Sequence, residues 1–277
     1  MTVVFVHGVP ETPAVWNALR ERIDRPTLAL RLPGFGTPRP AGLVDKEAYA
    51  AWLADELRAL GGPVDLVGHD WGVHLAMRVV SAYDVPVRSW VSDVAHGWHP
   101  GYRWHEAAVL FQQSPQGEEL LASLRADSPD SPSFGDFLRP RGMSAELATE
   151  VDAVHDEVMS AAVLALYRSA RPHLHADWGR EFGGPAPAPG LVLVPTGDPM
   201  AQPALDHEVA ARLGARTEEL DGLTHYWMLQ DPDRGAEALE RFWAAGGLMA
   251  AGAMALGLSL GVHLAVAAVV LVAAAGA

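Results

Sequence analysis

Residues 64–72 read VDLVGHDWG, a short apolar run followed by Gly68 and Gly72 on either side of three residues. The next residues, VHLAMRVV, have the apolar spacing of a helix. A Gly-x-residue-x-Gly pattern between a strand and a helix forces the central residue into a strained turn that holds its side chain above a sheet. Asp70 is that central residue. The stretch therefore predicts an α/β fold with a carboxylate presented where a central strand ends.

A carboxylate at this turn determines the chemistry that the turn can perform. A serine there needs a base to become nucleophilic, whereas an aspartate is already ionised at neutral pH and attacks without help. Carboxylates suit displacement at saturated carbon, which would leave an alkyl ester on Asp70 for a base-activated water to hydrolyse. The alternative interpretation is that Asp70 only caps the following helix, because aspartate is common near helix starts.

A base and a second acid are expected later in the chain, in the order nucleophile, acid, histidine. The loop GLTHYWMLQDPDR places His225 just before the last predicted helix, and LVLVPTGDPMAQP places Asp198 after the preceding strand. The Asp198 carboxylate would accept the imidazole N–H of His225 and fix its tautomer. Asp93, which ends the strand SWVSD, is the competing acid. We favour Asp198.

The loop HGVPET follows the first strand, at residues 7–12. The backbone N–H groups of Val9 and Trp71 are candidates for the donor pair that stabilises the negative oxygen formed when water attacks the ester. The alternative is that this loop only connects a strand to a helix.

Short apolar runs that end in glycine-rich turns alternate with helical patterns along the chain, which is typical of a parallel sheet flanked by helices. Ligands in such sheets bind beyond the carboxyl ends of the strands, so the loops HGVP, LPGFG and GHDWG are expected to face one crevice. We predict strands at 3–6, 27–30, 64–67, 87–91, 191–194 and 217–220. We predict helices at 12–23, 46–60, 72–83 and 232–244.

The stretch 97–189 is too long for an ordinary connection between strands. Helical periodicity recurs within it, separated by breaks rich in Pro and Ser. These helical segments are 106–111, 117–124, 145–155 and 158–169. We interpret 97–189 as a helical cap with its linker, inserted over the crevice of an α/β core formed by 1–96 and 190–245.

Composition restricts the classes of partner and the redox chemistry. The 277 residues carry a formal net charge of -14, without a run of Lys or Arg, so nucleic acid is not an expected partner. The absence of Cys excludes disulfides and thiolate metal sites. The N-terminus enters a strand pattern at once and does not resemble a secretion signal, so a cytoplasmic location is expected.

The segment 246–277 contains no charged residue and is rich in Ala, Gly, Val and Leu, with an interruption at His263. A helix of this composition would be apolar on nearly every face and long enough to span a bilayer. One hypothesis is a C-terminal membrane anchor that makes the protein membrane-associated. The alternative is that the tail packs on the protein itself or on a second copy in a homo-oligomer.

These motifs resemble the epoxide hydrolase and haloalkane dehalogenase group of the α/β-hydrolases, over about residues 1–245. The resemblance implies an α/β-hydrolase fold, a covalent alkyl-enzyme ester, a small apolar electrophilic substrate and no cofactor. It is carried by HGVPE (7–11), LPGFG (32–36), GHDWG (68–72), Asp198 and His225.

The epoxide hydrolase branch implies tyrosines in the cap that donate a hydrogen bond to the epoxide oxygen. The segment LALYRSARP resembles the cap helix of that branch and places Tyr167 at one such position. The position of the second tyrosine is occupied by Ala107, with His105 and Tyr102 nearby as substitutes. Glu11 in HGVPE also favours this branch. Tyr167 as a plain core residue is the alternative.

The dehalogenase branch implies two side-chain N–H groups that hold the departing halide, commonly a Trp after the nucleophile and an Asn or a second Trp. Trp71 is present, but position 9 is Val. The cap offers three candidate indoles, which are Trp98, Trp104 and Trp178. Epoxide hydrolysis to a diol is the favoured prediction, and haloalkane dehalogenation is the alternative.

Two further expectations follow from departures from the family. The chain begins at what would be the third strand of the family, so its usual first antiparallel hairpin is missing and one sheet edge is expected to lack cover. A different class of function also stays open, namely a non-catalytic interaction protein tethered to a membrane by its tail.

Overall fold

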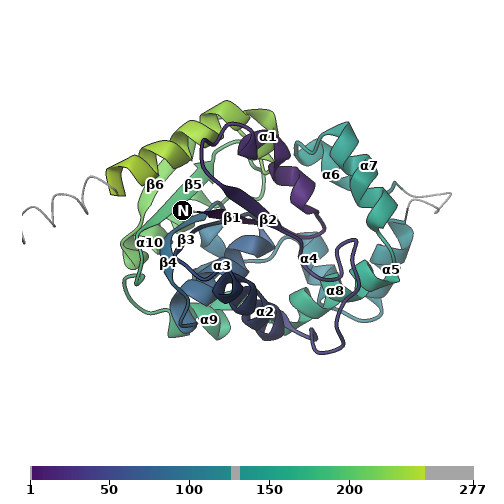
Figure 1. The fold of residues 1–277 in the computed structure, drawn as a ribbon. Helices are drawn as coiled ribbons and strands as arrows, with labels where there is room; N and C mark the ends of the chain where they lie inside the picture. The colour runs from purple at the N-terminus through teal and green to yellow at the C-terminus, as the bar shows by residue number, and fades with distance from the viewer. Residues whose placement is uncertain (1, 126–131, 247–277) are drawn as a thin grey trace, which may run out of the picture. The chain divides into compact units, whose positions relative to one another are not determined.

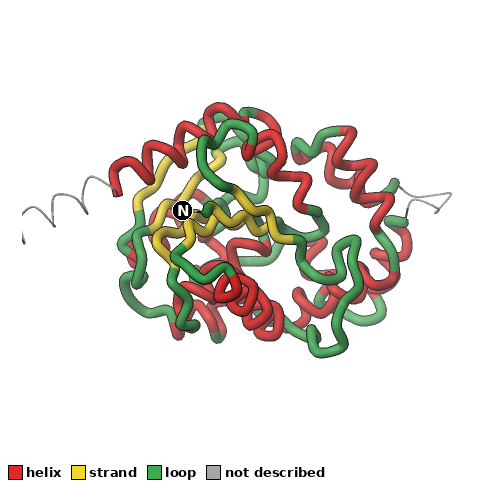
Figure 2. The backbone as a smooth tube through the Cα atoms, in the orientation of Figure 1, coloured by secondary structure: helices red, strands yellow, loops and turns green. Residues whose placement is uncertain are grey.

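Six parallel strands form one sheet in a computed structural model that describes residues 2–125 and 132–246. The strand order is β2-β1-β3-β4-β5-β6, and each neighbouring pair is parallel. The strands are β1 (Val3–Val6), β2 (Thr27–Leu30), β3 (Val64–Gly68), β4 (Val87–Ser92), β5 (Gly190–Pro195) and β6 (Arg216–Leu220). Figure 2 shows the strands surrounded by helices. The predicted α/β fold with a parallel sheet is confirmed.

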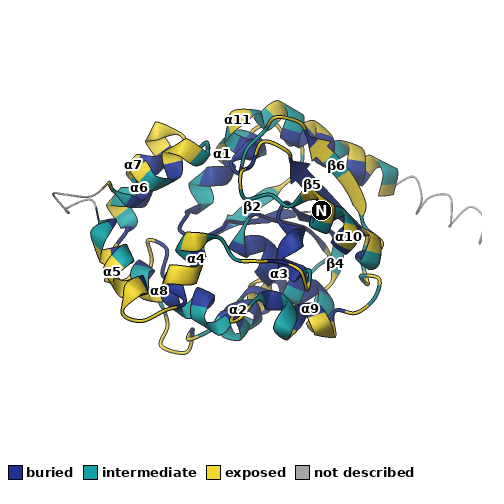
Figure 3. Ribbon diagram, turned by 180° about the vertical axis from the view of Figure 1, so that it is seen from behind, coloured by how far each residue is buried: buried dark blue, intermediate teal, exposed yellow. Residues whose placement is uncertain are grey.

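The central strands are continuous apolar runs because helices cover both faces of the sheet. Every residue of β1, β3 and β5 is buried, whereas the edge strands β2 and β6 are partly exposed. Figure 3 shows the same contrast between buried inner elements and exposed outer helices. The buried strands give the loops at their carboxyl ends a rigid base.

Two long helices, α2 (Lys46–Ala59) and α3 (Trp71–Ala82), pack together on one face of the sheet, and α1 (Asn17–Arg20) lies on the other (Figure 1). The predictions missed α10 (Pro203–Leu213), which connects β5 to β6. Two neighbouring parallel strands require such a crossover. The helix begins with a proline in its first turn and ends at a glycine with φ of 66°, both favourable at those ends.

The predicted continuous helix over 12–23 is wrong. The chain forms a 3-10 helix, η1 (Pro13–Trp16), followed by the single-turn helix α1. Trp16 is fully buried, with its ring 4.9 Å from Phe5 and 6.1 Å from His69. Tertiary packing of this large side chain therefore decides the local conformation, as it commonly does over helical propensity.

The region predicted as a cap consists of short helices, and α4 to α8 lie together beyond one end of the sheet (Figure 1). Helices near the four predicted segments are present, together with α6 and α9, which were not predicted. The helices are α4 (Glu106–Phe111), α5 (Gln116–Ser123), α6 (Phe134–Leu138), α7 (Ala145–Val154), α8 (Glu157–Ser169) and α9 (Trp178–Glu181). A 3-10 turn at Ala95–Trp98 precedes these helices, and two more at Arg139–Arg141 and Leu174–Ala176 lie between them.

The chain divides into two compact units, Met1–Ala236 and Glu237–Ala277, and the first contains both the sheet and the cap helices. The division of that unit into core and cap stays a prediction. The apolar tail lies outside the described residues from 247 on, so the anchor and homo-oligomer hypotheses stay predictions as well. None of the helices in the described part of the chain has the length and apolar character needed to span a bilayer.

Candidate active site

Asp70 occupies a strained turn between β3 and α3. Its φ of 49° and ψ of -120° make it the one non-glycine residue with positive φ in the described part of the chain. Its side chain makes no capping hydrogen bond to α3, which argues against the helix-cap interpretation. Gly72 is needed here because a β-carbon at that position would collide with the carbonyl of Val6. A β-carbon at Gly8 would lie 2.5 Å from Cβ of Asp70.

The two carboxylate oxygens of Asp70 have different surroundings. Oδ1 accepts a hydrogen bond of 2.9 Å from the backbone N–H of Val9. Oδ2 lies 4.0 Å from Nε2 of His225. Burial raises the pKa of Asp70, although the charge of His225 opposes the shift. The second predicted donor, the N–H of Trp71, lies in the first turn of α3, whose amides have no partner within the helix.

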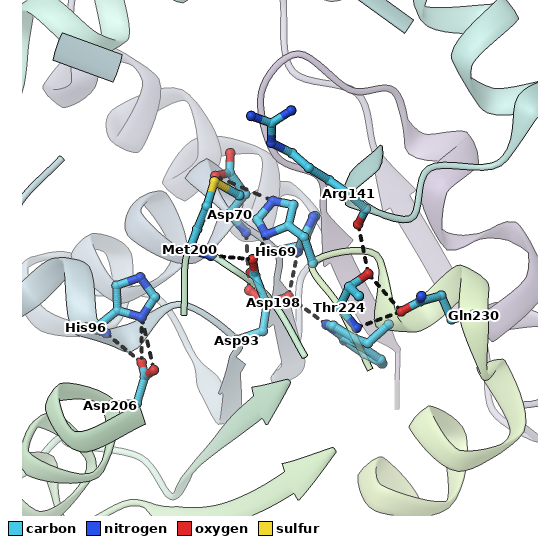
Figure 4. A network of polar contacts seen from close by, with 12 residues as sticks. His69, Asp70, Asp93, His96, Arg141, Asp198, Met200, Asp206, Thr224 and Gln230 are labelled. Carbon is cyan, nitrogen blue, oxygen red and sulfur yellow. Dashed lines mark hydrogen bonds and ion pairs between the residues drawn. The ribbon is translucent and has the colours of Figure 1, made fainter. Parts of the chain in front are cut away.

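The imidazole of His225 is oriented by Asp198. Its Nδ1 lies 2.9 Å from Oδ2 of Asp198. Oδ1 of Asp198 accepts the N–H of Met200 at 2.8 Å (Figure 4). Burial and the charge of His69 lower the pKa of His225, but the hydrogen bond and charge of Asp198 outweigh them, so the net shift is upward. Since Nδ1 faces Asp198, Nε2 is the nitrogen turned toward Asp70.

Asp93, the competing acid of the sequence analysis, makes its hydrogen bonds to other groups than His225. Its Oδ2 lies 2.5 Å from Nδ1 of His69 and 2.7 Å from the indole nitrogen of Trp227. Its Oδ1 accepts the backbone N–H of Asp70 at 3.2 Å. The structure therefore brings Asp198 to His225. Asp93 instead binds the backbone of the strained turn at Asp70 (Figure 4).

A second buried charge cluster, Glu11, His69 and Asp93, lies beside the first and was missed by sequence reasoning. Oε1 of Glu11 lies 3.1 Å from Nε2 of His69, and its Oε2 accepts the N–H of Gly8 at 3.0 Å. Burial lowers the pKa of His69, but the charges of Asp93 and Glu11 raise it well above its usual value. His69 is therefore an imidazolium between two carboxylates. The sequence contained a clue to this cluster, because Glu11 and His69 belong to the motifs HGVPE and GHDWG that the sequence analysis selected.

Two members of this cluster, together with His225, form the one group among the described residues that could share a metal ion. Ligand atoms of Glu11, His69 and His225 lie within 4.8 Å of one another. Both ring nitrogens of His69 face carboxylates, however, which favours a protonated ring over a metal ligand. The ring centroids of His69 and His225 are 4.6 Å apart. The positive charge of His69 thus opposes protonation of His225.

A small cavity lies over Asp70 and His225. Its wall includes Phe111, Phe134 and Phe137 from the cap. The cavity therefore combines the two predicted reacting groups with an aromatic surface.

Tyr167 and His105 line this cavity as well. Burial and the charge of Asp70 raise the pKa of Tyr167 well above its usual value, so its phenol keeps its proton. Burial lowers the pKa of His105 to about 4, so this imidazole is neutral at pH 7. Its Nδ1 accepts the N–H of Ala108 at 3.2 Å, which leaves the ring proton on Nε2. Tyr102, the other suggested substitute, lines a separate hollow.

The predicted halide-binding indoles differ in their partners. Trp98 donates to Nδ1 of His74, and Trp178 donates to Glu47. The indole N–H groups of Trp71 and Trp104 are buried and make no hydrogen bond of normal geometry among the described residues, although Trp71 is close enough to the hydroxyl of Tyr167 to lower the pKa of that phenol in part. These two rings are stacked with centroids 6.1 Å apart. Trp104 is thus the one of the three cap candidates that keeps its donor unused.

Tyr226 is a further cavity residue that sequence reasoning did not select. It is buried, and its ring lies 5.1 Å from that of His225 and 5.7 Å from that of His69. Burial and the charge of Glu11 raise its pKa well above the usual value. Its position directly after His225 placed Tyr226 near the site, but the sequence does not show whether its side chain points into the cavity.

The sequence model of the Alpha/beta hydrolase family matches residues 3–238. The match covers the strained turn, both predicted acids and His225, and the fold agrees with it. The chain belongs to the α/β-hydrolase family and is a hydrolase of that class, as the sequence predicted. No protein with a curated description matches the chain.

Solved structures of several hydrolases share this fold. A loop variant of the haloalkane dehalogenase DbeA from Bradyrhizobium elkanii is 19% identical, with a TM-score of 0.69 over 90% of this chain and 91% of that one. The epoxide hydrolase CorEH is 15% identical, with a TM-score of 0.68 over 88% and 91%. An esterase from Thermogutta terrifontis is 19% identical, with a TM-score of 0.62 over 89% and 90%. At these identities the likeness shows the fold alone.

Proposed function

We propose that this protein hydrolyses epoxides to diols through an ester on Asp70. The observation that carries the proposal is the unequal environment of the Asp70 carboxylate. The Val9 N–H holds Oδ1, while Oδ2 lies toward His225. One oxygen is thus anchored and the other is left to attack. The aromatic lining of the cavity supports small apolar electrophiles as substrates.

In the first step, Oδ2 of Asp70 attacks an epoxide carbon and forms a C–O bond. The carbon–oxygen bond of the ring breaks, and its electron pair moves to the ring oxygen. The phenol of Tyr167 donates a hydrogen bond and then its proton to that oxygen, with the Nε2 proton of His105 as a second donor. The raised pKa of Tyr167 supports this role, because the group must be protonated when the ring opens.

In the second step, Nε2 of His225 takes a proton from water, and the resulting hydroxide attacks Cγ of Asp70. Negative charge then develops on Oδ1, where the N–H groups of Val9 and Trp71 stabilise it. The bond between Oδ2 and the substrate carbon stays intact in this step. The bond between Cγ and Oδ2 breaks, and the diol leaves with a proton from His225. The carboxylic acid left at Asp70 then loses its proton, which restores the phenol of Tyr167.

The proposal predicts diol formation from styrene oxide, and Tyr167→Phe tests its donor. Removing one donor to developing negative charge lowers kcat by about 100-fold to 1,000-fold in comparable sites. We expect a loss of that size for Tyr167→Phe in an assay of diol product. The matched control is Tyr102→Phe, which removes a phenol outside the cavity and should retain activity within about twofold of the parent chain. Equal losses in both variants would remove Tyr167 from the mechanism.

Haloalkane dehalogenation is the second candidate, and the unused indole N–H groups of Trp71 and Trp104 favour it. Two such donors are suited to hold a departing halide. Neither indole lines the cavity over Asp70, whereas Tyr167 does. Because the donor suited to an epoxide oxygen is the one in the cavity, we favour epoxides over haloalkanes as substrates. Bromide release from 1-bromohexane, measured in parallel with diol formation from styrene oxide, separates the two reactions. A chain that performs neither would favour the non-catalytic hypothesis.

The two steps are expected to respond differently to pH. Alkylation needs ionised Asp70, and burial raises the pKa of this group, so kcat/KM should fall on acidification at a higher pH than for an ordinary aspartate. Ester hydrolysis needs neutral His225, whose pKa is raised, so this step should slow as pH falls through a value above about 6.5. Acid quenching followed by mass spectrometry should thus find more ester at pH 6 than at pH 9. An ester fraction that rises with pH would contradict these assignments.

A further inference from the structure

Arg141 lies in the cap at the end of η3 (Arg139–Arg141) and lines the same cavity as Asp70 and His225. Its backbone carbonyl accepts a hydrogen bond of 2.8 Å from the hydroxyl of Thr224, the residue before His225 (Figure 4). The backbone at position 141 is therefore tied to the loop that carries His225. This hydrogen bond holds the backbone of Arg141 in the cavity wall.

The guanidinium of Arg141 has apolar and backbone partners only. It lies over the ring of Phe137, with Cζ 4.1 Å from the ring centroid, and donates to the carbonyl oxygen of Phe137. Its neighbour Arg139, by contrast, faces Asp136 at 4.0 Å. No carboxylate lies within ion-pair distance of Arg141 in the part of the chain that the structure describes. Arg31 and Arg103 also donate to backbone carbonyls, but neither lines this cavity.

None of the other described lining residues forms an ion pair with the guanidinium of Arg141. Among the described lining residues, Asp70 is the one acid and Arg141 the one Arg or Lys. His105 is neutral, because burial and the positive charge of Arg141 lower its pKa. An anionic substrate in a cavity that contains the Asp70 carboxylate would be repelled unless a cation paired with it. A guanidinium offers a planar set of donors that matches a carboxylate.

We infer that Arg141 is a specificity-determining residue that selects electrophiles carrying a carboxylate away from the reacting carbon. The inference rests on the proposed function and narrows its substrate class. In the complex, the guanidinium pairs with the substrate carboxylate while the aromatic wall holds the intervening apolar part. Asp70 is then left to attack the epoxide carbon, and the two negative groups are kept apart.

A matched pair of epoxides tests this inference, namely styrene oxide and 4-(oxiran-2-yl)benzoate. We expect the parent chain to show the higher kcat/KM for the carboxylated compound. Arg141→Gln should lower the ratio of the two kcat/KM values by about tenfold to 100-fold, the range measured for hydrogen bonds to charged groups. The control is Arg139→Gln, an exposed arginine three positions from Asp136, which should leave the ratio unchanged. An equal ratio in all three chains would overturn the inference and assign Arg141 to packing against Phe137.

A binding measurement separates this inference from the proposed function. Calorimetry with the unreactive 4-ethylbenzoate should show binding to the parent chain and to Arg139→Gln, and binding about tenfold weaker or more to Arg141→Gln. This result would support the anion site even if no epoxide were opened, in which case only the proposed reaction would fail. Diol formation combined with equal 4-ethylbenzoate binding in all three chains would preserve the reaction and overturn the role of Arg141.

Discussion

Asp70→Asn is expected to abolish turnover of styrene oxide, with a loss in kcat/KM of about 10,000-fold or more, as for other removed nucleophiles. The amide keeps the size of the side chain and can still accept the N–H of Val9, but it has no anionic oxygen to attack carbon. The measurement is diol formation under conditions in which the parent chain turns over many times.

Folding of the Asp70→Asn variant serves as its internal check. Burial raises the pKa of Asp70, so the ionised carboxylate destabilises the folded state at neutral pH, and a neutral amide should not lower Tm. The matched control is Asp55→Asn on the exposed face of α2, where the side chain is 77% exposed; activity should be unchanged. Diol formation by Asp70→Asn at the rate of the parent chain would exclude Asp70 as the nucleophile.

His225→Gln is expected to stop the reaction after its first half. Alkylation of Asp70 needs no base, so one epoxide per chain should still be consumed. Hydrolysis of the ester needs the imidazole held by Asp198 at 2.9 Å, and kcat should fall by about 1,000-fold or more. Quenched-flow measurements should thus show a burst of epoxide consumption followed by very slow diol release.

The control for this variant is His207→Gln, because His207 has a partly exposed side chain, pairs with Glu219 at 3.4 Å and does not line the cavity over Asp70. It should turn over like the parent chain. A His225→Gln protein that neither consumes epoxide nor releases diol would contradict the two-step mechanism, provided that its Tm shows it to be folded. Normal turnover would assign the base to another residue.

The strained turn and the parallel sheet could be predicted because their signals are local. Two glycines at fixed spacing around Asp70, between an apolar run and a helical pattern, have few other structural uses. The order of Asp198 and His225 along the chain then followed from the topology of the fold. The choice between Asp93 and Asp198 could not be made with the same certainty, because both end strands of the same sheet and only side-chain direction separates them.

Other parts of the site depend on contacts between distant segments, which the sequence does not display. His69 and Asp93 meet where two neighbouring strands end, and Arg141 lines the cavity from a cap segment whose backbone is hydrogen-bonded to Thr224. The surroundings of such groups set their charge: the carboxylates of Asp93 and Glu11 raise the pKa of His69, whereas burial lowers the pKa of His105. The pairings and charges of these residues therefore required the structure.

The central claim is that the substrate becomes covalently attached to Asp70 and that His225 is needed to release it. Peptide mass spectrometry of the His225→Gln protein after incubation with styrene oxide tests this claim most directly. We predict that the peptide containing residue 70 gains the mass of one styrene oxide molecule and that fragmentation places the gain on Asp70. An unmodified Asp70 peptide from folded protein that has consumed the epoxide would contradict the claim.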